Sequence, residues 1–314
     1  MRLIVYLLGG IFLAACLPEQ QNSTVASPAD NTVSTQMVTL GDKLFHDVSL
    51  SSQGNQACAS CHDVNRAFSD ADKTIPVSKG SEVGQFGTRN TPAASYTRFI
   101  PPLHQEQDDG ETLWIGGLFL DGRVNNLEEQ AQKPFLNPAE MNNKDAADVV
   151  AKLRASTNAN LFREVFGSDA LDIGKEDQAF GQMAQAIAAF ERTPVFSPFS
   201  SKFDFYLQGK AQFTTLELQG MSLFIRADKG NCAACHPVTA SADGTPALFT
   251  DFSYDNIGVP RHPNRQFFTE NFVDEGLAKT TNDPTLRGQF RVATLRNIAK
   301  TAPYMHNGRF DNLR

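Results

Sequence analysis

The sequence is poor in several residue types and patterns. Its 314 residues include only five cysteines, six histidines and one tryptophan, and the formal net charge of −7 is spread along the chain. No block of Lys and Arg is present, which excludes the clustered basic surface that binds nucleic acids. No apolar run reaches the roughly 20 residues that a membrane-spanning helix needs. With 41% hydrophobic and 20% charged residues, the chain is globular rather than disordered.

The N-terminus carries a short apolar run, 3–15, after Met1 and Arg2. This run fits the core of a secretory signal peptide, predicted over 1–15. It ends in "LAAC", and Cys16 resembles the lipidated cysteine of a bacterial lipobox; an ordinary signal peptide with a chance cysteine is the alternative. Polar residues over 17–36 predict a flexible tether. We therefore expect a periplasmic protein held to a membrane only by a lipid anchor, with Leu17 favouring the outer membrane.

The other four cysteines form two C-x-x-C pairs, and each pair is followed at once by histidine. The two motifs are "CASCH" at 58–62 and "CAACH" at 232–236. A shared zinc site usually has its pairs within about 15–20 residues, far less than the separation here. A thioredoxin-like dithiol needs no following histidine. The remaining reading is covalent c-type haem, in which two thiols bond the porphyrin edge and the histidine binds iron.

The motifs thus predict two c-type haems. The attachment residues are Cys58, Cys61, Cys232 and Cys235, and the proximal iron ligands are His62 and His236. Zinc and a redox dithiol remain as alternatives.

The chain also resembles itself around these motifs. Each half contains Leu-Phe, then C-x-x-C-H, then Arg-Asn, then Asp/Asn-Gly-Arg; 88–93 answers 295–303, and 121–130 answers 307–314. Apolar residues at helical spacing over 177–192 predict a helix, and Thr214 with Glu217 predicts a capping box. We expect a mainly α fold of two cytochrome c-type haem domains related by internal duplication, spanning 37–196 and 197–314, with the boundary at 193–204.

Several stretches together resemble the bacterial di-haem cytochrome c peroxidase family, which includes the MauG-type oxidases. They are "LGDKLF", "CASCH", "GTRNTPA", "FLDGRVNNLEEQAQKPFLNPAEM", "GNCAACH" and "VATLRNIAKTAPYMHNGRF". The resemblance implies that hydrogen peroxide is reduced at the first haem. Electrons would enter at the second haem from a monohaem cytochrome c or a cupredoxin. It also implies Gln130 and Glu140 as catalytic pocket residues, and a calcium ion held by Asn90, Thr301 and Pro303.

The sequence departs from this family pattern in three places. The loop 76–90 has no histidine, so we expect the first haem to be five-coordinate and open. Leu120 stands where the family places a tryptophan between the haems, and the single tryptophan is Trp114. The distal ligand of the second haem is expected beyond Arg314, in a chain predicted to be incomplete at that end.

Other candidate side chains follow from these departures. Met305 is either a core residue or a substitute thioether ligand, and His306 matches a family histidine near the haems. His46, His104 and His262 are expected to be surface or satisfied histidines. The prediction is a di-haem peroxidase; a MauG-like oxidase that modifies a partner protein and a non-enzymatic electron carrier are the alternatives. A homodimer is compatible with the sequence.

Overall fold

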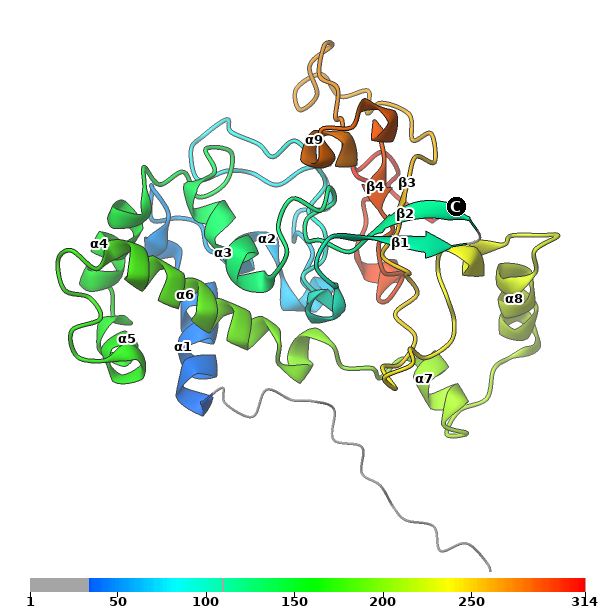
Figure 1. Cartoon of the computed structure of the whole chain (residues 1–314), viewed down its shortest axis with the longest axis horizontal. Coiled ribbons are helices and arrows are strands. Elements are labelled where there is room, and N and C mark those ends of the chain that lie inside the picture. Colours follow the sequence, from blue (N-terminus) through cyan, green and yellow to red (C-terminus); the bar gives the residue numbers. More distant parts are fainter. Residues whose placement is uncertain (1–33, 109, 314) are drawn as a thin grey trace, which may run out of the picture. The chain divides into compact units, whose positions relative to one another are not determined.

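The computed structural model describes residues 34–108 and 110–313, and its regular elements are mostly helices (Figure 1). The α-helices are α1 Thr35–Phe45, α2 Cys58–Cys61, α3 Leu127–Leu136, α4 Ala146–Ala155, α5 Ala159–Phe166, α6 Glu176–Glu191, α7 Lys202–Leu207, α8 Thr215–Ile225 and α9 Leu277–Thr281. Short 3-10 turns include η3 Thr97–Phe99, η4 Pro194–Phe196, η5 Cys232–Ala234 and η7 Ile298–Lys300. The mainly α prediction is confirmed, whereas the internal duplication stays a prediction.

The predicted signal peptide and Cys16 lie outside the described residues. Helix α1 begins at Thr35, capped by the Ser34 side chain, so the last residues of the predicted tether are helical instead. No helix in the described ranges is long and apolar enough to cross a membrane.

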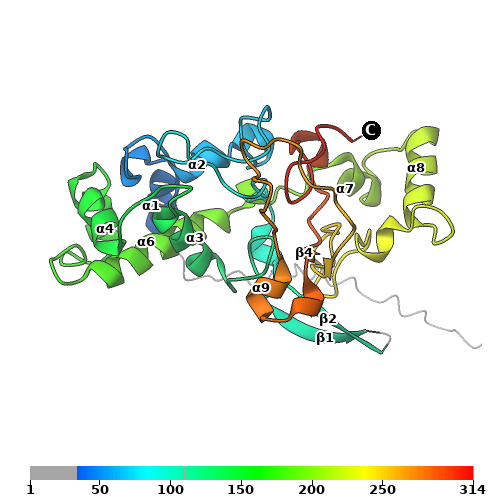
Figure 2. The same ribbon diagram turned by 90° about the horizontal axis from the view of Figure 1, so that it is seen from above.

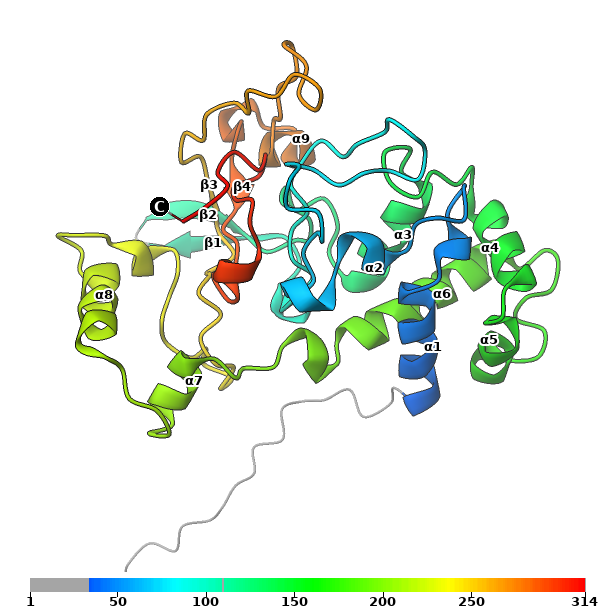
Figure 3. The same cartoon turned by 180° about the vertical axis from the view of Figure 1, so that it is seen from behind.

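The first core is built around α6, which α1, α3 and α4 contact (Figures 1 and 3). As the periodicity of 177–192 predicted, α6 buries one continuous apolar stripe because residues three and four apart share a helix face. That stripe packs against Leu40 and Leu44 of α1 and Phe135 of α3. These contacts place the turn that carries the first C-x-x-C-H motif beside the core.

A glycine sets the distance between α1 and α6. A Cβ added to Gly41 would lie 1.9 Å from the backbone oxygen of Ala186, closer than any side chain could fit. Absence of a side chain at this position therefore lets the two helix backbones approach. The corresponding glycine of α8, Gly220, has nothing within 4 Å of such a Cβ.

Helix α8 opens with the predicted capping box, in which Thr214 accepts a hydrogen bond from the Glu217 amide and Glu217 accepts one from the Thr214 amide. None of its residues is buried, and Leu216 is 77% exposed. All three views show α8 well separated from α1 and α6 (Figure 2). Its apolar side chains thus form no core with the described residues.

Each half of the chain contributes one small antiparallel ladder, and the two ladders contact each other. Strand β1 (His104–Asp108) pairs with β2 (Glu111–Ile115), and β3 (Tyr254–Asp255) pairs with β4 (Phe290–Arg291). The hairpin β1–β2 is joined to β3 by the Gly116 amide, which donates to Phe252. Figure 2 shows the hairpin next to β4. Residues from before the predicted boundary at 193–204 therefore also pack against the segments that follow it.

Candidate functional site

The first C-x-x-C-H motif forms a single helical turn, α2, that ends in His62. The Nδ1 atom of His62 lies 2.8 Å from the carbonyl oxygen of Phe68. Because a carbonyl can only accept, Nδ1 carries the proton, and Nε2 is left with a free lone pair. Burial lowers the pKa of His62, which favours the neutral imidazole. A neutral ring with a free Nε2 is the form that binds iron.

The thiols of this motif are protonated and unbridged. Burial raises the pKa of Cys61 to about 12, and it raises the pKa of Cys58 further above the ordinary range. Neither cysteine forms a disulfide. A thiol that holds its proton is a poor nucleophile, since nucleophilic attack needs the thiolate. This chemistry disfavours the redox dithiol alternative.

The two motifs do not meet to form one metal site. Within 34–108 and 110–313, no group of three or more His, Cys, Asp or Glu side chains is arranged to hold a metal ion. Zinc bound jointly by both cysteine pairs is therefore wrong. Each pair instead lines its own cavity.

The cavity beside His62 has a volume of about 760 Å³, within the range of cofactor sites. Cys58, Cys61 and His62 line it, and so do both predicted catalytic residues, Gln130 and Glu140. Gln130 lies on α3, and Glu140 follows the end of that helix. Burial raises the pKa of Glu140, although Arg123 and the side chain of Asn137 act in the opposite direction. The structure thus brings these residues together; their roles remain predictions.

A second carboxyl group, which sequence reasoning missed, lines the same cavity. Glu191 closes the C-terminal end of α6 and is 6% exposed. It has no hydrogen bond or ion pair with any residue that the structure describes. Burial raises its pKa to about 8, with Arg192 lowering it and Glu128 raising it. Its place at the end of an apolar helical stripe gave no sequence signal.

Among the residues that the structure describes, His62 is the only histidine lining this first cavity. The loop 76–90 contributes Ser78 and residues 87–90 to its wall, as a segment without imidazoles. Met141 also lines the cavity, but its side chain is packed in the core at 2% exposure. These neighbours favour the expectation that the first haem is open on one side.

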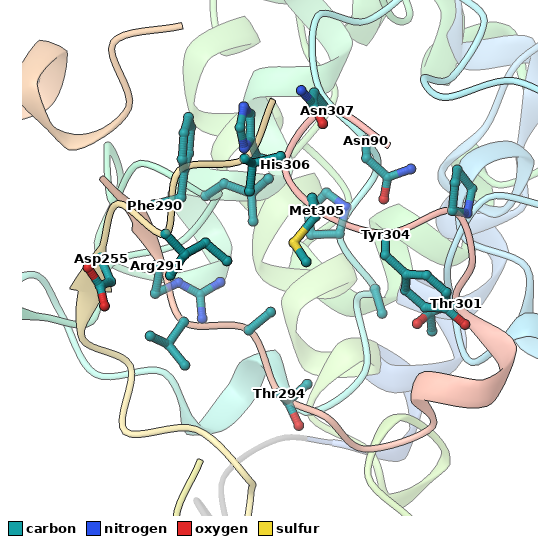
Figure 4. A pocket seen from close by; sticks show the side chains of 18 of the residues that line it. Asn90, Asp255, Phe290, Arg291, Thr294, Thr301, Tyr304, Met305, His306 and Asn307 are labelled. Carbon is teal, nitrogen blue, oxygen red and sulfur yellow. The ribbon is translucent and has the colours of Figure 1, made fainter. Parts of the chain in front are cut away.

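The second C-x-x-C-H motif has the same local geometry as the first. His236 Nδ1 lies 2.7 Å from the carbonyl oxygen of Phe249, which again leaves Nε2 free. Cys232, Cys235 and His236 line a cavity of about 1360 Å³. Figure 4 shows Arg291, Met305 and His306 among the side chains around it.

Further hydrogen bonds repeat between the two halves. The Phe68 carbonyl accepts from the Ala94 amide, and the Phe249 carbonyl accepts from the Leu295 amide. This correspondence pairs Tyr96 with Asn297, since both are left-handed residues that open a 3-10 turn. These hydrogen bonds favour another register than the expected match of 88–93 with 295–303, and the repeat itself stays a prediction.

In the second repeated segment, the hydrogen bonds agree with the predicted register of 121–130 and 307–314. The Leu118 amide donates to Val124, as the Tyr304 amide donates to Phe310, each at 2.7 Å. This places Met305 at the tip of the loop with φ of 72°. Met305 lines the cavity and is 41% exposed, so the core-packing reading is wrong. The tight loop turns its side chain away from any core.

The remaining histidines divide into two groups. His306 stacks on Phe290 with ring centroids 3.9 Å apart, and both line the second cavity. His262 also lines that cavity. His46 and His104 bond to nearby backbone carbonyls at the surface, as expected.

The predicted calcium residues lie on one wall of the second cavity. Asn90, Thr301 and Pro303 all line it, and Figure 4 labels the first two. The Asn90 side-chain amide donates to Pro76, which leaves its oxygen free. The Thr301 and Pro303 carbonyls accept no hydrogen bond from the described residues. Three free oxygens are the donor type that calcium prefers.

Trp114 and Leu120 occupy different surroundings. Leu120 is buried and lines both cavities, whereas Trp114 lies on β2 and lines neither. No tryptophan therefore stands between the cavities.

A buried charge network connects the halves near Leu120. Arg89 pairs with Asp121 at 2.8 Å and with Asp274 at 2.6 Å. Both carboxylates are largely buried, so the pairs are shielded from water. Sequence reasoning missed this network, because ion pairs between distant segments leave no local pattern.

Comparisons with known proteins agree with this site. The sequence profile described as di-haem cytochrome c peroxidase matches residues 35–212. The chain belongs to the di-haem cytochrome c peroxidase family. It is an oxidoreductase, and membership of this family implies two c-type haems, which the two Cys-Cys-His cavities fit.

The named relatives include both MauG proteins and cytochrome c peroxidases. Methylamine utilization protein MauG of Paracoccus denitrificans is 38% identical over 311 residues, covering 96% of this chain and 77% of that protein. Cytochrome c551 peroxidase of Nitrosomonas europaea is 32% identical over 305 residues, with coverages of 96% and 77%. The diheme peroxidase BthA of Burkholderia thailandensis superposes with a TM-score of 0.82 at 34% identity, covering 89% of this chain and 70% of BthA.

Proposed function

We propose that this chain reduces hydrogen peroxide to water in the periplasm, with electrons from a small donor such as a monohaem cytochrome c or a cupredoxin. His236 would hold the haem that receives the electrons, and His62 would hold the haem at which peroxide is reduced. The observation that carries the proposal is the first cavity. There Gln130 and a partly buried Glu140 line the same space as His62, with no second histidine among the described residues.

Conversion of one peroxide to two waters consumes two electrons and two protons. The haems would supply the electron transfer and the iron position at which peroxide binds. Glu140 would take the proton from the inner peroxide oxygen and give it to the outer oxygen, which then departs as water. The raised pKa of Glu140 helps it to return that proton. Gln130 would orient the peroxide by hydrogen bonding.

A MauG-like oxidase that modifies a partner protein is the second candidate. The first cavity favours it equally, because an imidazole-free loop 76–90 leaves that site open in either enzyme. Leu120 argues against it. Oxidation of a partner protein over a distance needs redox-active side chains, and an aliphatic residue cannot carry a hole between the cavities. In peroxide reduction with a soluble donor, electrons would pass directly from one haem site to the other, and no side chain would need to be oxidised.

Steady-state peroxide reduction with a reduced cytochrome c tests the proposal. We expect turnover in the wild type and a loss of about 10²- to 10⁴-fold in Glu140→Gln. Glu164→Gln, an exposed change on α5, is the matched control and should keep full activity. A wild-type chain with both haems but no turnover would support an electron carrier. An unchanged rate in Glu140→Gln would remove Glu140 from the mechanism.

The proposal also includes lipid attachment at Cys16 and calcium at Asn90, Thr301 and Pro303. Mass spectrometry of exported protein should show lipid at Cys16 in the wild type and none in Cys16→Ser. Chelation should remove one calcium per chain, and Asn90→Ala should weaken its rebinding. A protein without metal before chelation would contradict the calcium assignment.

A further inference from the structure

The two cavities share a wall. It is built from residues of the segments 88–97 and 272–274, together with Ile100, Leu120 and Arg291. Most of these side chains are apolar or small and polar. Two of them, Asp274 and Arg291, carry a charge. Any group that acts on both cavities at once must come from this wall.

Asp274 is already neutralised, because Arg89 donates to its carboxylate through two nitrogen atoms at 2.6 and 2.7 Å. Arg291 has no such partner. No carboxylate of the described residues lies within 4.0 Å of its guanidinium group. Its Nε and one terminal nitrogen donate to the carbonyl oxygen of Phe119 at 3.3 and 3.1 Å. The other terminal nitrogen, Nη1, makes no hydrogen bond in the described part of the chain.

The backbone holds Arg291 firmly in this place. Its amide donates to the Leu120 carbonyl at 2.9 Å, and its residue pairs with Tyr254 in the ladder of β3 and β4. The guanidinium also lies over the ring of Phe252. Partial burial lowers the pKa of Arg291. Figure 4 shows the side chain extending from β4 among the residues of the cavity wall.

A partly buried guanidinium without an anion is unfavourable, so such groups are retained where a ligand supplies the negative charge. Every haem carries two propionate carboxylates on an otherwise apolar ring. The planar fork of arginine suits carboxylates, because two N–H groups can reach two oxygens. We propose that Arg291 binds propionate carboxylates of both haems and is the one cation common to their two sites.

This role has an electrostatic consequence. A positive charge beside an iron centre stabilises the reduced state relative to the oxidised state, so Arg291 raises the reduction potential of both haems. Arg291 lies in the same shared wall as Leu120, the residue that stands where the family places a tryptophan. The inference requires both cavities to hold haem, but it is independent of the proposed peroxide reduction.

Spectroelectrochemical titration of the di-haem protein, without peroxide, tests the inference. In Arg291→Met the oxidised-to-reduced ratio of both haems at a fixed potential should rise about tenfold, which equals a shift of about 59 mV for a one-electron couple. Arg291→Lys keeps the charge and should restore most of the potential. Arg287→Met is the matched control. It lies four positions earlier, pairs with Glu275 at the surface and lines neither cavity, so both potentials should stay within twofold of the wild-type ratio.

Two results would overturn the proposal. In the first, both reduction potentials stay unchanged in Arg291→Met although both haems are covalently attached. In the second, only one potential shifts, which would assign Arg291 to a single haem site. If Arg291→Met does not acquire both haems, the resonance Raman spectra of Arg291→Lys test the proposal instead. Loss of the two-pronged contact should shift the propionate bands of both haems, and bands identical to those of the wild type would reject the contact.

Discussion

Arg296 donates two hydrogen bonds to the carboxylate of Asp204, at 2.8 and 3.0 Å, and both side chains are almost fully buried. A third bond joins Arg296 to the Ala247 carbonyl. The pair therefore connects α7 to two segments of the second cavity. Its position next to the rings of Phe199 and Phe249 excludes water.

Breaking this pair should destabilise the protein strongly. Removal of one partner leaves a buried charge unpaired, and we expect Arg296→Met to lower the free energy of unfolding by about 3–5 kcal/mol. Arg287→Met breaks the exposed pair with Glu275 and should cost at most about 1 kcal/mol. Denaturant unfolding of both holoproteins measures the difference. Equal losses would show that burial does not strengthen the Arg296 pair.

Gly41 and Gly220 should respond in opposite directions to the same substitution. Gly→Ala in a helix interior normally stabilises by about 0.5–1 kcal/mol, which is the expectation for Gly220→Ala in the open surroundings of α8. In Gly41→Ala the new methyl group would meet the Ala186 backbone, and overpacking of this kind costs about 1–3 kcal/mol. Thermal unfolding tests both variants. Stabilisation by Gly41→Ala would contradict the close helix contact.

Peroxide reduction should depend on pH through Glu140. Burial raises the pKa of this carboxyl, so it stays protonated to a higher pH than an ordinary glutamate. Because the carboxylate must accept a proton, the rate should rise as pH increases through the folded-state pKa, above about 4.5. Rates measured from pH 4 to 9 should show this rise in the wild type, and Glu140→Gln should lack it. The same pH limb in both proteins would point to another group.

Glu191 should make stability depend on pH. Its pKa is raised to about 8 in the folded protein, so between pH 4.5 and 8 the folded state binds more protons than the unfolded state. Stability therefore falls as pH rises through this window, by a few kcal/mol in total. Glu191→Gln should unfold at a higher temperature than the wild type at pH 9 and at a similar temperature at pH 5. Glu164→Gln is the control, and an equal difference at both pH values would contradict the buried carboxyl.

What the sequence by itself determined is local. In both C-x-x-C-H motifs the thiols and the imidazole lie within five consecutive residues, so one turn of the chain brings them together. The helix over 177–192 and the cap at Thr214 likewise follow from interactions between residues three or four positions apart. These features needed no knowledge of the fold, and the structure has them where they were expected.

Only the tertiary structure decided what surrounds those motifs. The partial burial of Glu140, the full burial of Glu191, the Arg89 network and the position of Arg291 between the cavities all depend on segments far apart in sequence. Desolvation and charge pairing are properties of such neighbours, and no spacing in the chain encodes them. The repeat shows the same limit, because Tyr96 matches Asn297 through its hydrogen-bonding environment rather than through its residue type.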